Sequence, residues 1–480
     1  MYSNTNYIIK SEGCFSVPLS STIGVKQGCN ISPLLFNLFV NDIHEIFDQN
    51  CKPLNINNWR VNSLSFADDL VLISETENGL RNSLAALEKY CNAWGLKINP
   101  NKTKVLVFNE AFSKNLKKLS FSIDGDPIAT TNSYCYLGIE VSNTGSFIKA
   151  TEVLYKKALK ALFSIYSSLD VRSDKINTRL FLKLFDSLIQ PILLYGCDIW
   201  GSHVKNTNNA TNKFILKCYR TLLGVPPNSS TAGLHCELGR FPIHVIIQQT
   251  MLRYWFRLIS LPGNRLASHC YWSLVDVCPS NDPWLSTIQE IIYSSGQYYI
   301  WNGQKTFASL NHTERRKYEL YMTRTLQDIS VQHLSEKTKT ETKLHFLENC
   351  KNKFEISSYL TRVYGRTRRS LLSKLRLGVL DLEIEIKRRN AIPREERFCK
   401  LCASQEVEDE IHFILNCPSL GQCREPFIQN IAALNPRYQS MSPHGKIKYL
   451  FFNEALPNNI LEIAISLLAS LAKNRKTLLN

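Results

Sequence analysis

Ser65-Phe66-Ala67-Asp68-Asp69-Leu70 is the stretch that decides how this chain is interpreted. Runs of apolar and β-branched residues lie on both sides of it, and two such runs joined by a short polar stretch predict a β-hairpin. Both carboxylates would then project from the turn. Like charges this close repel unless a cation lies between them, and hard divalent ions such as Mg²⁺ take carboxylate oxygens as ligands. A solvated turn is the alternative, because Asp is also favoured in turns.

The segment upstream adds a second pattern. The loop Gly24-Val25-Lys26-Gln27-Gly28 leads to Ser32-Pro33, which predicts a helix start with Ser32 as N-cap, followed by an apolar helix from Leu34 to Phe47. Two further motifs follow the hairpin in order, Gly95-Leu96-Lys97-Ile98-Asn99 with Lys102-Thr103-Lys104, and then Tyr136-Leu137-Gly138. In their order and spacing, the four motifs resemble those of the reverse transcriptases of non-LTR retrotransposons.

The resemblance implies an α+β fold. It implies a partial right-hand polymerase palm, with a βαβ sheet and the hairpin bearing FADD, then a mainly helical thumb and C-terminal region with a small zinc knuckle. The expected divisions are a palm with its primer-grip hairpin at 1–145, a helical thumb-like region at 146–265, a helical connector with a basic arm at 266–395, a CCHC zinc knuckle at 396–425 and a helical tail at 426–480.

The resemblance also implies an RNA-directed DNA polymerase that acts on an RNA template, a DNA primer and deoxynucleotides. Asp68 would be the main ligand of Mg²⁺ or Mn²⁺, with Asp69 as its weaker neighbour. The remaining implied contacts are Gln27, Gly28 and Lys102 for template or nucleotide, and Tyr136, Leu137 and Gly138 for the primer end.

The family pattern includes a first palm strand that carries its own catalytic Asp. No such strand precedes Gly24 in this sequence. Two carboxylates from one turn hold paired divalent ions poorly, so we expect polymerisation to be impaired. A non-catalytic nucleic-acid-binding module and a decayed element fragment are the alternatives. No nuclease motif is evident either, so target cleavage would have to come from elsewhere.

Composition narrows the class of protein. The chain has 480 residues, 44% of them hydrophobic, which is typical of a globular protein with two or three domains. Its net charge of +16 favours a polyanionic partner.

The 15 cysteines are scattered and no signal peptide precedes them, which favours a reducing compartment, nuclear or cytoplasmic. The apolar stretch from Ile460 to Ala472 is too short for a membrane span of about 20 residues, so no membrane partner is expected.

Local patterns predict several further elements. Apolar residues between 79 and 94 recur at helical spacing, and Asp124-Gly125 is a strong hairpin dipeptide. A second helical stripe is expected to be core, and its members are Ile176, Leu180, Leu184, Leu188 and Ile192.

Residues 351–400 form a basic arm, with 14 Lys or Arg against 6 Asp or Glu, a net charge of +8. Guanidinium and aromatic groups alternate here and can contact phosphates and stack on bases. The predicted nucleic-acid contacts are Arg362, Arg366, Arg368 and Arg369, with Tyr359 and Tyr364 beside them. An exposed helix that only maintains solubility is the alternative.

A metal knuckle is predicted directly after the arm. Cys399 and Cys402 form a CxxC pair, and His412 and Cys417 follow at a spacing that suits tetrahedral Zn²⁺ with a closed, structural shell. Cys423 is an alternative to Cys417 as the fourth ligand. The acidic residues in between are expected to be a solvated loop, and they are Glu406, Glu408, Asp409 and Glu410.

Overall fold

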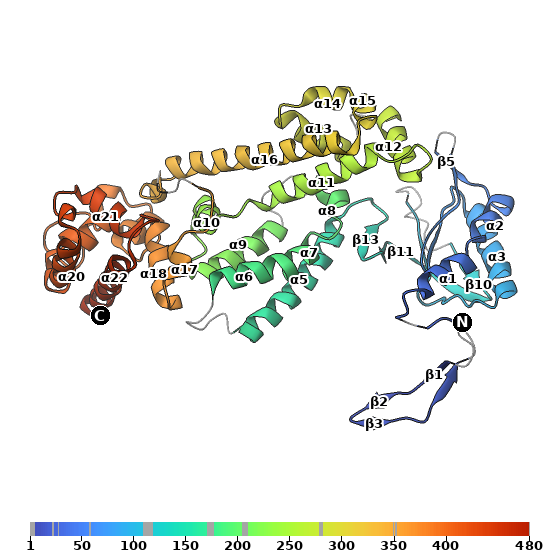
Figure 1. Ribbon diagram of the computed structural model, residues 1–480, viewed down its shortest axis with the longest axis horizontal. Coiled ribbons are helices and arrows are strands. Elements are labelled where there is room, and N and C mark those ends of the chain that lie inside the picture. The colour runs from blue at the N-terminus through green and yellow to red at the C-terminus, as the bar shows by residue number, and fades with distance from the viewer. Residues whose placement is uncertain are drawn as a thin grey trace. The chain divides into compact units, whose positions relative to one another are not determined.

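Two compact units make up the chain in the computed structural model, which describes residues 5–21, 24–26, 28–56, 59–108, 119–169, 177–203, 210–277, 282–348, 350 and 353–479 (Figure 1). Unit 1 contains Met1–Tyr136, Val141–Ser146 and Leu261–Val277, and unit 2 contains Leu137–Glu140, Phe147–Ser260 and Cys278–Asn480. Strands concentrate in unit 1, whereas unit 2 is mainly helical. The mixed α and β composition predicted from the sequence is therefore confirmed.

Unit 1 combines short strands with four helices among its described residues. The helices are α1 (Ser32–Phe39), α2 (Ile43–Asn50), α3 (Glu77–Trp94) and α12 (Leu266–Val277). The strands are β1 (Thr5–Tyr7), β2 (Lys10–Ser11), β3 (Cys14–Phe15), β4 (Leu19–Ser21), β5 (Leu54–Ile56), β6 (Trp59–Val61), β7 (Ser63–Phe66), β8 (Asp69–Leu72), β9 (Lys104–Leu106), β10 (Phe121–Ile123), β11 (Asp126–Thr131) and β12 (Ser133–Tyr136). Strand β13 (Ile139–Ser142) runs across the boundary between the units.

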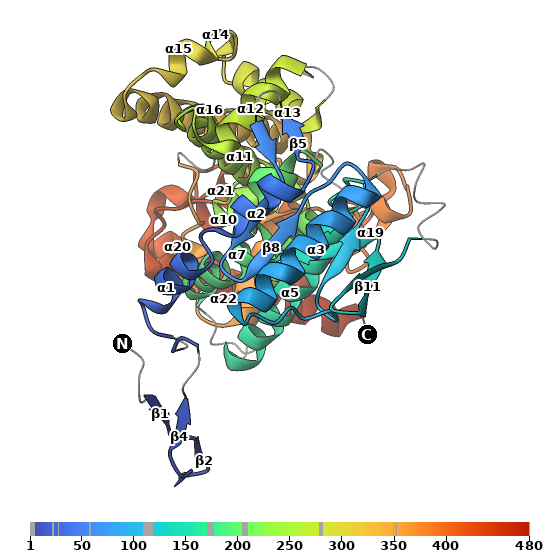
Figure 2. The same ribbon diagram turned by 90° about the vertical axis from the view of Figure 1, so that its right-hand side faces the viewer.

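Helix α3 forms as its sequence predicts. The Thr76 side chain caps the N-terminus by accepting a hydrogen bond from the Gly79 N–H at 3.1 Å, and Gly95 ends the helix in the left-handed conformation. Its apolar face is buried against α2, which packs beside it (Figure 2), and against the strands of unit 1. The side chains at the centre of this core are Phe47, Leu84, Leu87, Tyr90, Phe121 and Ile123.

Both predicted hairpins are confirmed. β7 pairs antiparallel with β8, so that Phe66 lies opposite Asp69. β10 pairs antiparallel with β11, and Asp124 and Gly125 between them have φ angles of 50° and 83°, as a two-residue turn with the right twist requires.

The described strands do not pair as one palm-like βαβ sheet. β9 pairs in parallel with β11, and Lys104 lies opposite Ala129. Among the described strands, the β7–β8 hairpin pairs only within itself. β8 and β9 are therefore joined by α3 but belong to separate ladders, and the hairpin shares the core of the three-stranded sheet β10-β11-β9 through the side chains of Leu70 and Leu72.

The helix predicted from Leu34 to Phe47 is two helices. α1 ends at Phe39 and α2 begins at Ile43, and the carboxylate of Asp42 between them accepts a hydrogen bond from the Tyr90 hydroxyl at 2.6 Å. The prediction that Ser32 is the N-cap is wrong. Ser32 lies inside α1, and its hydroxyl donates to the backbone oxygen of Lys26 at 2.7 Å.

Helix α12 belongs to unit 1, although its residues were expected in a connector. His269 on this helix hydrogen-bonds the backbone oxygen of Ile56 at 3.0 Å, and its ring lies 5.2 Å from that of Trp59. These contacts attach α12 to the β5–β6 hairpin.

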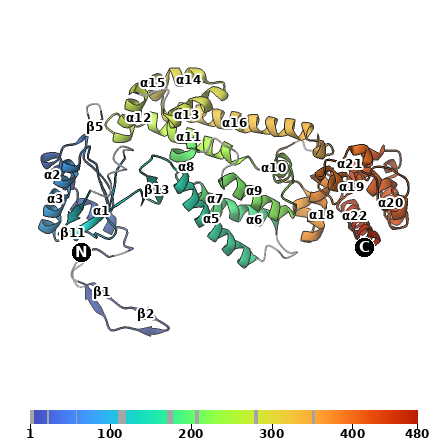
Figure 3. The same ribbon diagram turned by 180° about the vertical axis from the view of Figure 1, so that it is seen from behind.

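Unit 2 is built from packed helices. The long helices α11 (Ile243–Ile259) and α16 (His312–Thr340) run side by side (Figure 3). The other helices used below are α5 (Ile148–Leu169), α6 (Thr178–Leu184), α7 (Gln190–Leu193), α9 (Ala210–Leu223), α10 (Thr231–Leu238), α18 (Arg366–Arg376), α19 (Glu383–Arg389), α20 (Gly421–Leu434) and α22 (Asn458–Leu479).

The second helical stripe is buried on a different face from the one predicted. Leu180 and Leu188 are 44% and 49% exposed, whereas Phe181, Phe185 and Ile189 are buried. The two rows lie one residue apart, and the row with two aromatic side chains removes more apolar area from water. A π-helical turn from Phe185 to Ile189 continues α6 into α7. Ile176 lies outside the described residues.

No single helix in the described part of the chain is long and apolar enough to cross a membrane, although the bent pair Thr178–Leu193 and Cys197–His203 meets that test of length and composition when taken together.

Candidate functional sites

The acidic pair lies at the tip of the β7–β8 hairpin, as predicted. Ala67 and Asp68 form the two-residue loop, and Asp69 is the first residue of β8. Both carboxylates are exposed. Ala67 has a φ of 52°, a left-handed conformation that costs a non-glycine residue about 1 kcal/mol. The turn therefore presents two adjacent anionic side chains to solvent.

Two side-chain bridges from α2 support the start of the hairpin. The His44 ring nitrogens lie 2.8 Å from the Ser63 hydroxyl and 3.0 Å from the Ser65 hydroxyl. The buried Asn62 amide donates to Asp48 at 2.6 Å. Nothing in the local sequence marks these partners, because they lie 14 to 21 positions apart.

Tyr136 lies near the acidic pair. Partial burial raises the pKa of its hydroxyl, and the negative charge of Asp69 raises it further. The next residues, Leu137 and Gly138, form a turn with φ angles of 46° and 84°. Tyr195, which the sequence did not single out, donates its hydroxyl to the Leu137 backbone oxygen at 2.9 Å. The φ of 84° favours glycine at position 138, where a Cβ atom would also lie in tight contact with the Tyr195 ring, at 3.1 Å.

The predicted template and nucleotide contacts are only partly described. Gln27 lies outside the described residues. Gly28 is exposed, with a φ of 80°. Lys102 is also exposed, and its backbone oxygen accepts a hydrogen bond from the Tyr134 hydroxyl at 3.1 Å. The roles of Gln27, Gly28 and Lys102 stay predictions.

The four predicted arginines all have partners within unit 2. Arg362 donates to the Asn458 side chain and to backbone oxygens just before α22. Arg366 donates to the Thr221 backbone oxygen. Arg368 forms an ion pair with Glu462 at 3.2 Å. Arg369 is buried and donates to the Val363 backbone oxygen. Their part in nucleic-acid binding stays a prediction, and Arg369 contributes to packing.

The predicted zinc ligands come together in space. One ligand atom from each of Cys399, Cys402, His412 and Cys417 lies within 4.8 Å of all the others. Tetrahedral zinc with Zn–S bonds of about 2.3 Å separates its sulfur ligands by roughly 3.8 Å, so the spacing suits that ion. Cys423 is not part of the cluster, and its sulfur lies 2.8 Å from the Ser470 hydroxyl on α22.

His412 is oriented to bind a metal through one nitrogen. Its Nε2 atom lies 3.4 Å from the Cys402 sulfur, and its Nδ1 atom lies 2.7 Å from a carboxylate oxygen of Glu406. A carboxylate that accepts the second ring N–H fixes the tautomer and raises the basicity of the ligating nitrogen. Glu406 itself is exposed, as predicted for a solvated loop, and it is not a member of the ligand cluster, but it also orients His412.

The cysteines of the cluster differ in acidity. Burial raises the pKa of Cys399 to about 12. Burial also acts to raise the pKa of Cys402, but hydrogen bonds from Ser404, Cys399 and His412 outweigh it and lower that pKa to about 7. Cys402 is thus the thiol that most readily supplies a thiolate near neutral pH.

A buried ion pair joins the knuckle to the C-terminal helix. Glu408 accepts two hydrogen bonds of 2.7 Å from the Arg475 guanidinium on α22, and one of its oxygens also accepts the Glu383 backbone N–H at 2.8 Å. Glu408 and Glu410 are buried, so the prediction of a solvated loop is wrong for these two residues. Burial raises the pKa of Glu410 to about 7.

The part of the chain that carries the acidic hairpin matches a known protein family. Residues 4–141 match the family described as "Reverse transcriptase (RNA-dependent DNA polymerase)". The "Probable RNA-directed DNA polymerase from transposon BS" of Drosophila melanogaster is 25% identical over 52% of this chain and 28% of its own length. The "RNA-directed DNA polymerase from mobile element jockey" of Drosophila funebris is 22% identical over 55% of this chain and 28% of its own length.

A third relative belongs to another element. The "Retrovirus-related Pol polyprotein from type-1 retrotransposable element R2" of Popillia japonica is 33% identical over 25% of this chain and 21% of its own length. The chain thus spans less than a third of each of these three relatives. Residues 4–141, which carry the acidic hairpin, are therefore similar to reverse transcriptases, and these three relatives are named as RNA-directed DNA polymerases or a Pol polyprotein of mobile elements.

Proposed function

We propose that this chain is part of an RNA-directed DNA polymerase of a non-LTR retrotransposon, and that its acidic hairpin contributes to nucleotide addition on an RNA template. The observation that carries the proposal is the exposed pair Asp68 and Asp69 at the hairpin tip, inside the stretch that matches the reverse transcriptase family. Carboxylates that must reach a primer end and a nucleotide have to be accessible, and this turn makes them so.

The proposal includes a polymerase division of the chain. Unit 1 corresponds to part of a palm, the turn at Tyr136 to Gly138 corresponds to a primer grip, and the helices of 146–265 correspond to a thumb. Two observations support this division. The negative charge of Asp69 reaches Tyr136, and Tyr195 holds the turn at Leu137 through a hydrogen bond of 2.9 Å.

The acidic pair fits a divalent ion only in part. Two adjacent carboxylates supply oxygen ligands of the kind that Mg²⁺ and Mn²⁺ take. Among the described residues, no third Asp, Glu, His or Cys joins them in a ligand cluster. A bound ion would acidify the primer hydroxyl and stabilise the leaving pyrophosphate, but a two-ion site needs a bridging carboxylate from another strand. We therefore propose that this chain by itself polymerises weakly.

Primer extension on an RNA template with Mn²⁺ tests the proposal. We expect slow extension that Asp68→Asn abolishes, because Asp68 is exposed and its replacement leaves the hairpin intact. Mn²⁺ binding, followed by electron paramagnetic resonance, should be weak and should also depend on Asp68. Extension that survives Asp68→Asn would refute the assignment. So would a chain that neither extends a primer nor loses Mn²⁺ affinity in this variant.

We also propose that Cys399, Cys402, His412 and Cys417 hold a structural Zn²⁺. Four protein ligands close the coordination shell and leave no position for a substrate. The clustering of the ligand atoms and the Glu406 contact to His412 support this. Metal analysis of the purified chain should find one zinc per chain, and Cys402→Ser should lose it.

A second function is a nucleic-acid-binding module that does not polymerise. The absence of a third carboxylate near the acidic pair, within the residues described, favours it. Under this reading, RNA or DNA binding is salt-sensitive, survives Asp68→Asn and fails after zinc chelation. Loss of binding in Asp68→Asn with the fold intact would count against it.

A further inference from the structure

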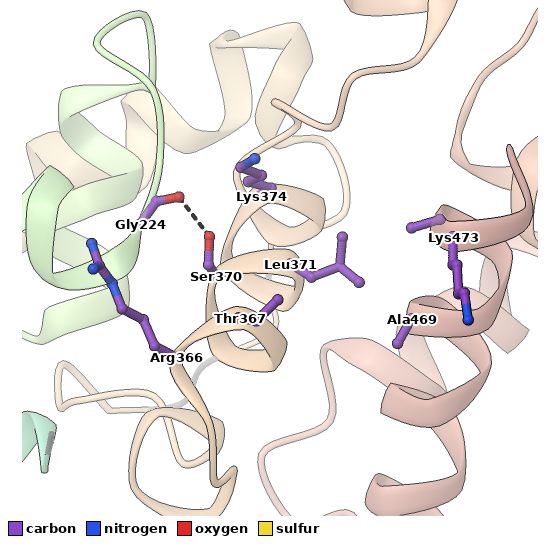
Figure 4. A pocket seen from close by; sticks show the side chains of 9 residues that line it. Gly224, Arg366, Thr367, Ser370, Leu371, Lys374, Ala469 and Lys473 are labelled. Carbon is purple, nitrogen blue, oxygen red and sulfur yellow. Dashed lines mark hydrogen bonds between the residues drawn. The ribbon is translucent and has the colours of Figure 1, made fainter. Parts of the chain in front are cut away.

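A groove in unit 2 is lined by α18, α22 and the residue that follows α9 (Figure 4). Its volume is about 570 Å³, which falls within the range of about 300–1,000 Å³ that is usual for ligand sites. Figure 4 shows Leu371 pointing from α18 toward Ala469 and Lys473 on α22. Leu371, Ala469 and Ala472 give the groove an apolar lining.

The charged side chains that line the groove are all basic. They are Arg366 and Lys374 from α18 and Lys473 from α22, and the described residues that line the groove include no Asp or Glu. The Lys374 ammonium lies 4.0 Å from the carboxylate of Asp381, which is itself largely exposed. Lys473 is also exposed. Lys473, and Lys374 beside this exposed carboxylate, therefore bring positive charge to the groove.

The helices that carry these cations are fixed in place. The Ser370 hydroxyl donates to the Gly224 backbone oxygen at 2.6 Å, which attaches α18 to the end of α9. A Cβ atom at Gly224 would lie 2.6 Å from that hydroxyl, so glycine is required there. Lys473 lies two residues before Arg475, which the buried Glu408 holds through two hydrogen bonds. These contacts fix the backbone positions from which Lys374 and Lys473 extend.

We propose that this groove binds the phosphodiester backbone of a nucleic-acid strand, with Lys374 and Lys473 contacting phosphates. The inference rests on the proposed function, which requires the chain to hold a polynucleotide. Phosphate contacts from basic side chains supply most sequence-independent affinity for nucleic acids. Tyr364, two residues before Arg366 and 84% exposed, offers a ring on which a base can stack.

The test is the affinity and salt dependence of the full chain for fluorescent single-stranded RNA, single-stranded DNA and duplex DNA of one length. The variant Lys374→Gln/Lys473→Gln should bind roughly tenfold more weakly, and its log-log salt slope for single strands should fall by about 1.4, since each lost phosphate contact contributes about 0.7. Lys317→Gln/Lys339→Gln, which removes the same charge from exposed positions of α16, is the matched control and should bind as the wild type does.

Lys374→Arg/Lys473→Arg keeps the charge and should restore binding, while thermal unfolding checks that every variant is folded. Weakening confined to RNA would assign the groove to the template strand, and weakening confined to DNA would assign it to the primer or target strand. The proposal is overturned if the glutamine variant binds like its control, or if the arginine variant is as weak as the glutamine variant.

Two further outcomes overturn it as well. One is a wild-type chain that binds no oligonucleotide, and the other is binding to phosphatidylserine vesicles but not to oligonucleotides. Primer extension on the same preparations separates this inference from the proposed function. If extension depends on Asp68 while Lys374→Gln/Lys473→Gln binds normally, the groove assignment alone fails. If binding depends on the two lysines while extension ignores Asp68, the polymerase assignment alone fails.

Discussion

The acidic hairpin of unit 1 and the Cys/His cluster of unit 2 are both candidate metal sites, but they are built in opposite ways. Asp68 and Asp69 are exposed neighbours in sequence, and no third ligand joins them among the described residues. The cluster gathers four ligands from a 19-residue stretch, buries three of them and orients His412 with a carboxylate. A structural site must be complete and enclosed, whereas a catalytic site must stay open to its substrates.

The difference extends to how each site is tied to the fold. The hairpin pairs within itself and contacts its core through Leu70 and Leu72. The cluster is joined to α22 by the buried pair of Glu408 and Arg475. Removing a ligand of the cluster should therefore destabilise unit 2 strongly. Removing Asp68 or Asp69 should hardly change the stability of unit 1.

Loss of zinc should have the largest effect. Zinc binding to small knuckles contributes about 10–16 kcal/mol of apparent free energy, much of it coupled to folding. We expect Cys402→Ser, or a strong chelator, to unfold the knuckle and release α22, seen as hydrogen exchange of α22 amides. Cys423→Ser is the matched control because its sulfur lies outside the cluster. If the α22 amides are equally protected from hydrogen exchange in Cys402→Ser and Cys423→Ser, the cluster does not hold α22 in place.

Breaking the buried ion pair should have the next largest effect. Arg475→Met leaves the Glu408 carboxylate buried without its partner, which costs about 3–5 kcal/mol in the free energy of unfolding. The exposed pair of Arg368 and Glu462 provides the control, because Arg368→Met should cost at most about 1 kcal/mol. Denaturant unfolding measures both values, and similar costs for the two variants would refute the role given to Glu408.

Acid should destabilise unit 2 through His235. Burial lowers the pKa of this imidazole to about 4, and its Nδ1 atom lies 2.8 Å from the Arg240 backbone oxygen. The folded chain protonates His235 less readily than the unfolded chain does. The stabilisation that the neutral His235 side chain gives to the folded chain is therefore complete above pH 6.5 and is lost as the pH falls toward 4. The loss amounts to about 3 kcal/mol.

His235→Gln keeps a donor for the Arg240 oxygen and cannot titrate, so it is the matching variant. The difference in unfolding free energy between neutral and acid solution should shrink by that amount. An unchanged pH dependence would show that His235 is not buried in its neutral form.

Replacing the acidic pair should have the smallest effect on stability. Asp68→Asn/Asp69→Asn removes two like charges from an exposed turn, and surface changes of this kind alter the free energy of unfolding by roughly 0.5 kcal/mol at most. The midpoint of denaturant unfolding should therefore stay near that of the wild type, even though primer extension is lost. A large destabilisation would mean that the pair has structural partners.

The features that the sequence predicts well are local. Helix α3 carries its own cap at Thr76 and its own stop at Gly95, and Asp124-Gly125 specifies its turn without outside help. The zinc ligands are also predicted by spacing alone, since a CxxC pair points both thiolates at one ion.

The features that the sequence misses depend on tertiary contacts. Tyr90 hydrogen-bonds Asp42, which lies between α1 and α2, from 48 positions away. Arg475 buries Glu408 from a distance of 67 positions, which turns an acidic loop into part of the core. The two faces near Phe185 and Leu188 have the same helical spacing, so periodicity could not tell which of them packs inward.

Metal retention tests the contrast between the two sites most directly. The chain would be loaded with Zn²⁺ and Mn²⁺, dialysed extensively against metal-free buffer and analysed for both elements. We predict one zinc per chain and no manganese, because among the described residues only the cluster offers a closed set of ligands. Manganese that stays bound through Asp68, or a folded chain that retains no zinc, would contradict this prediction.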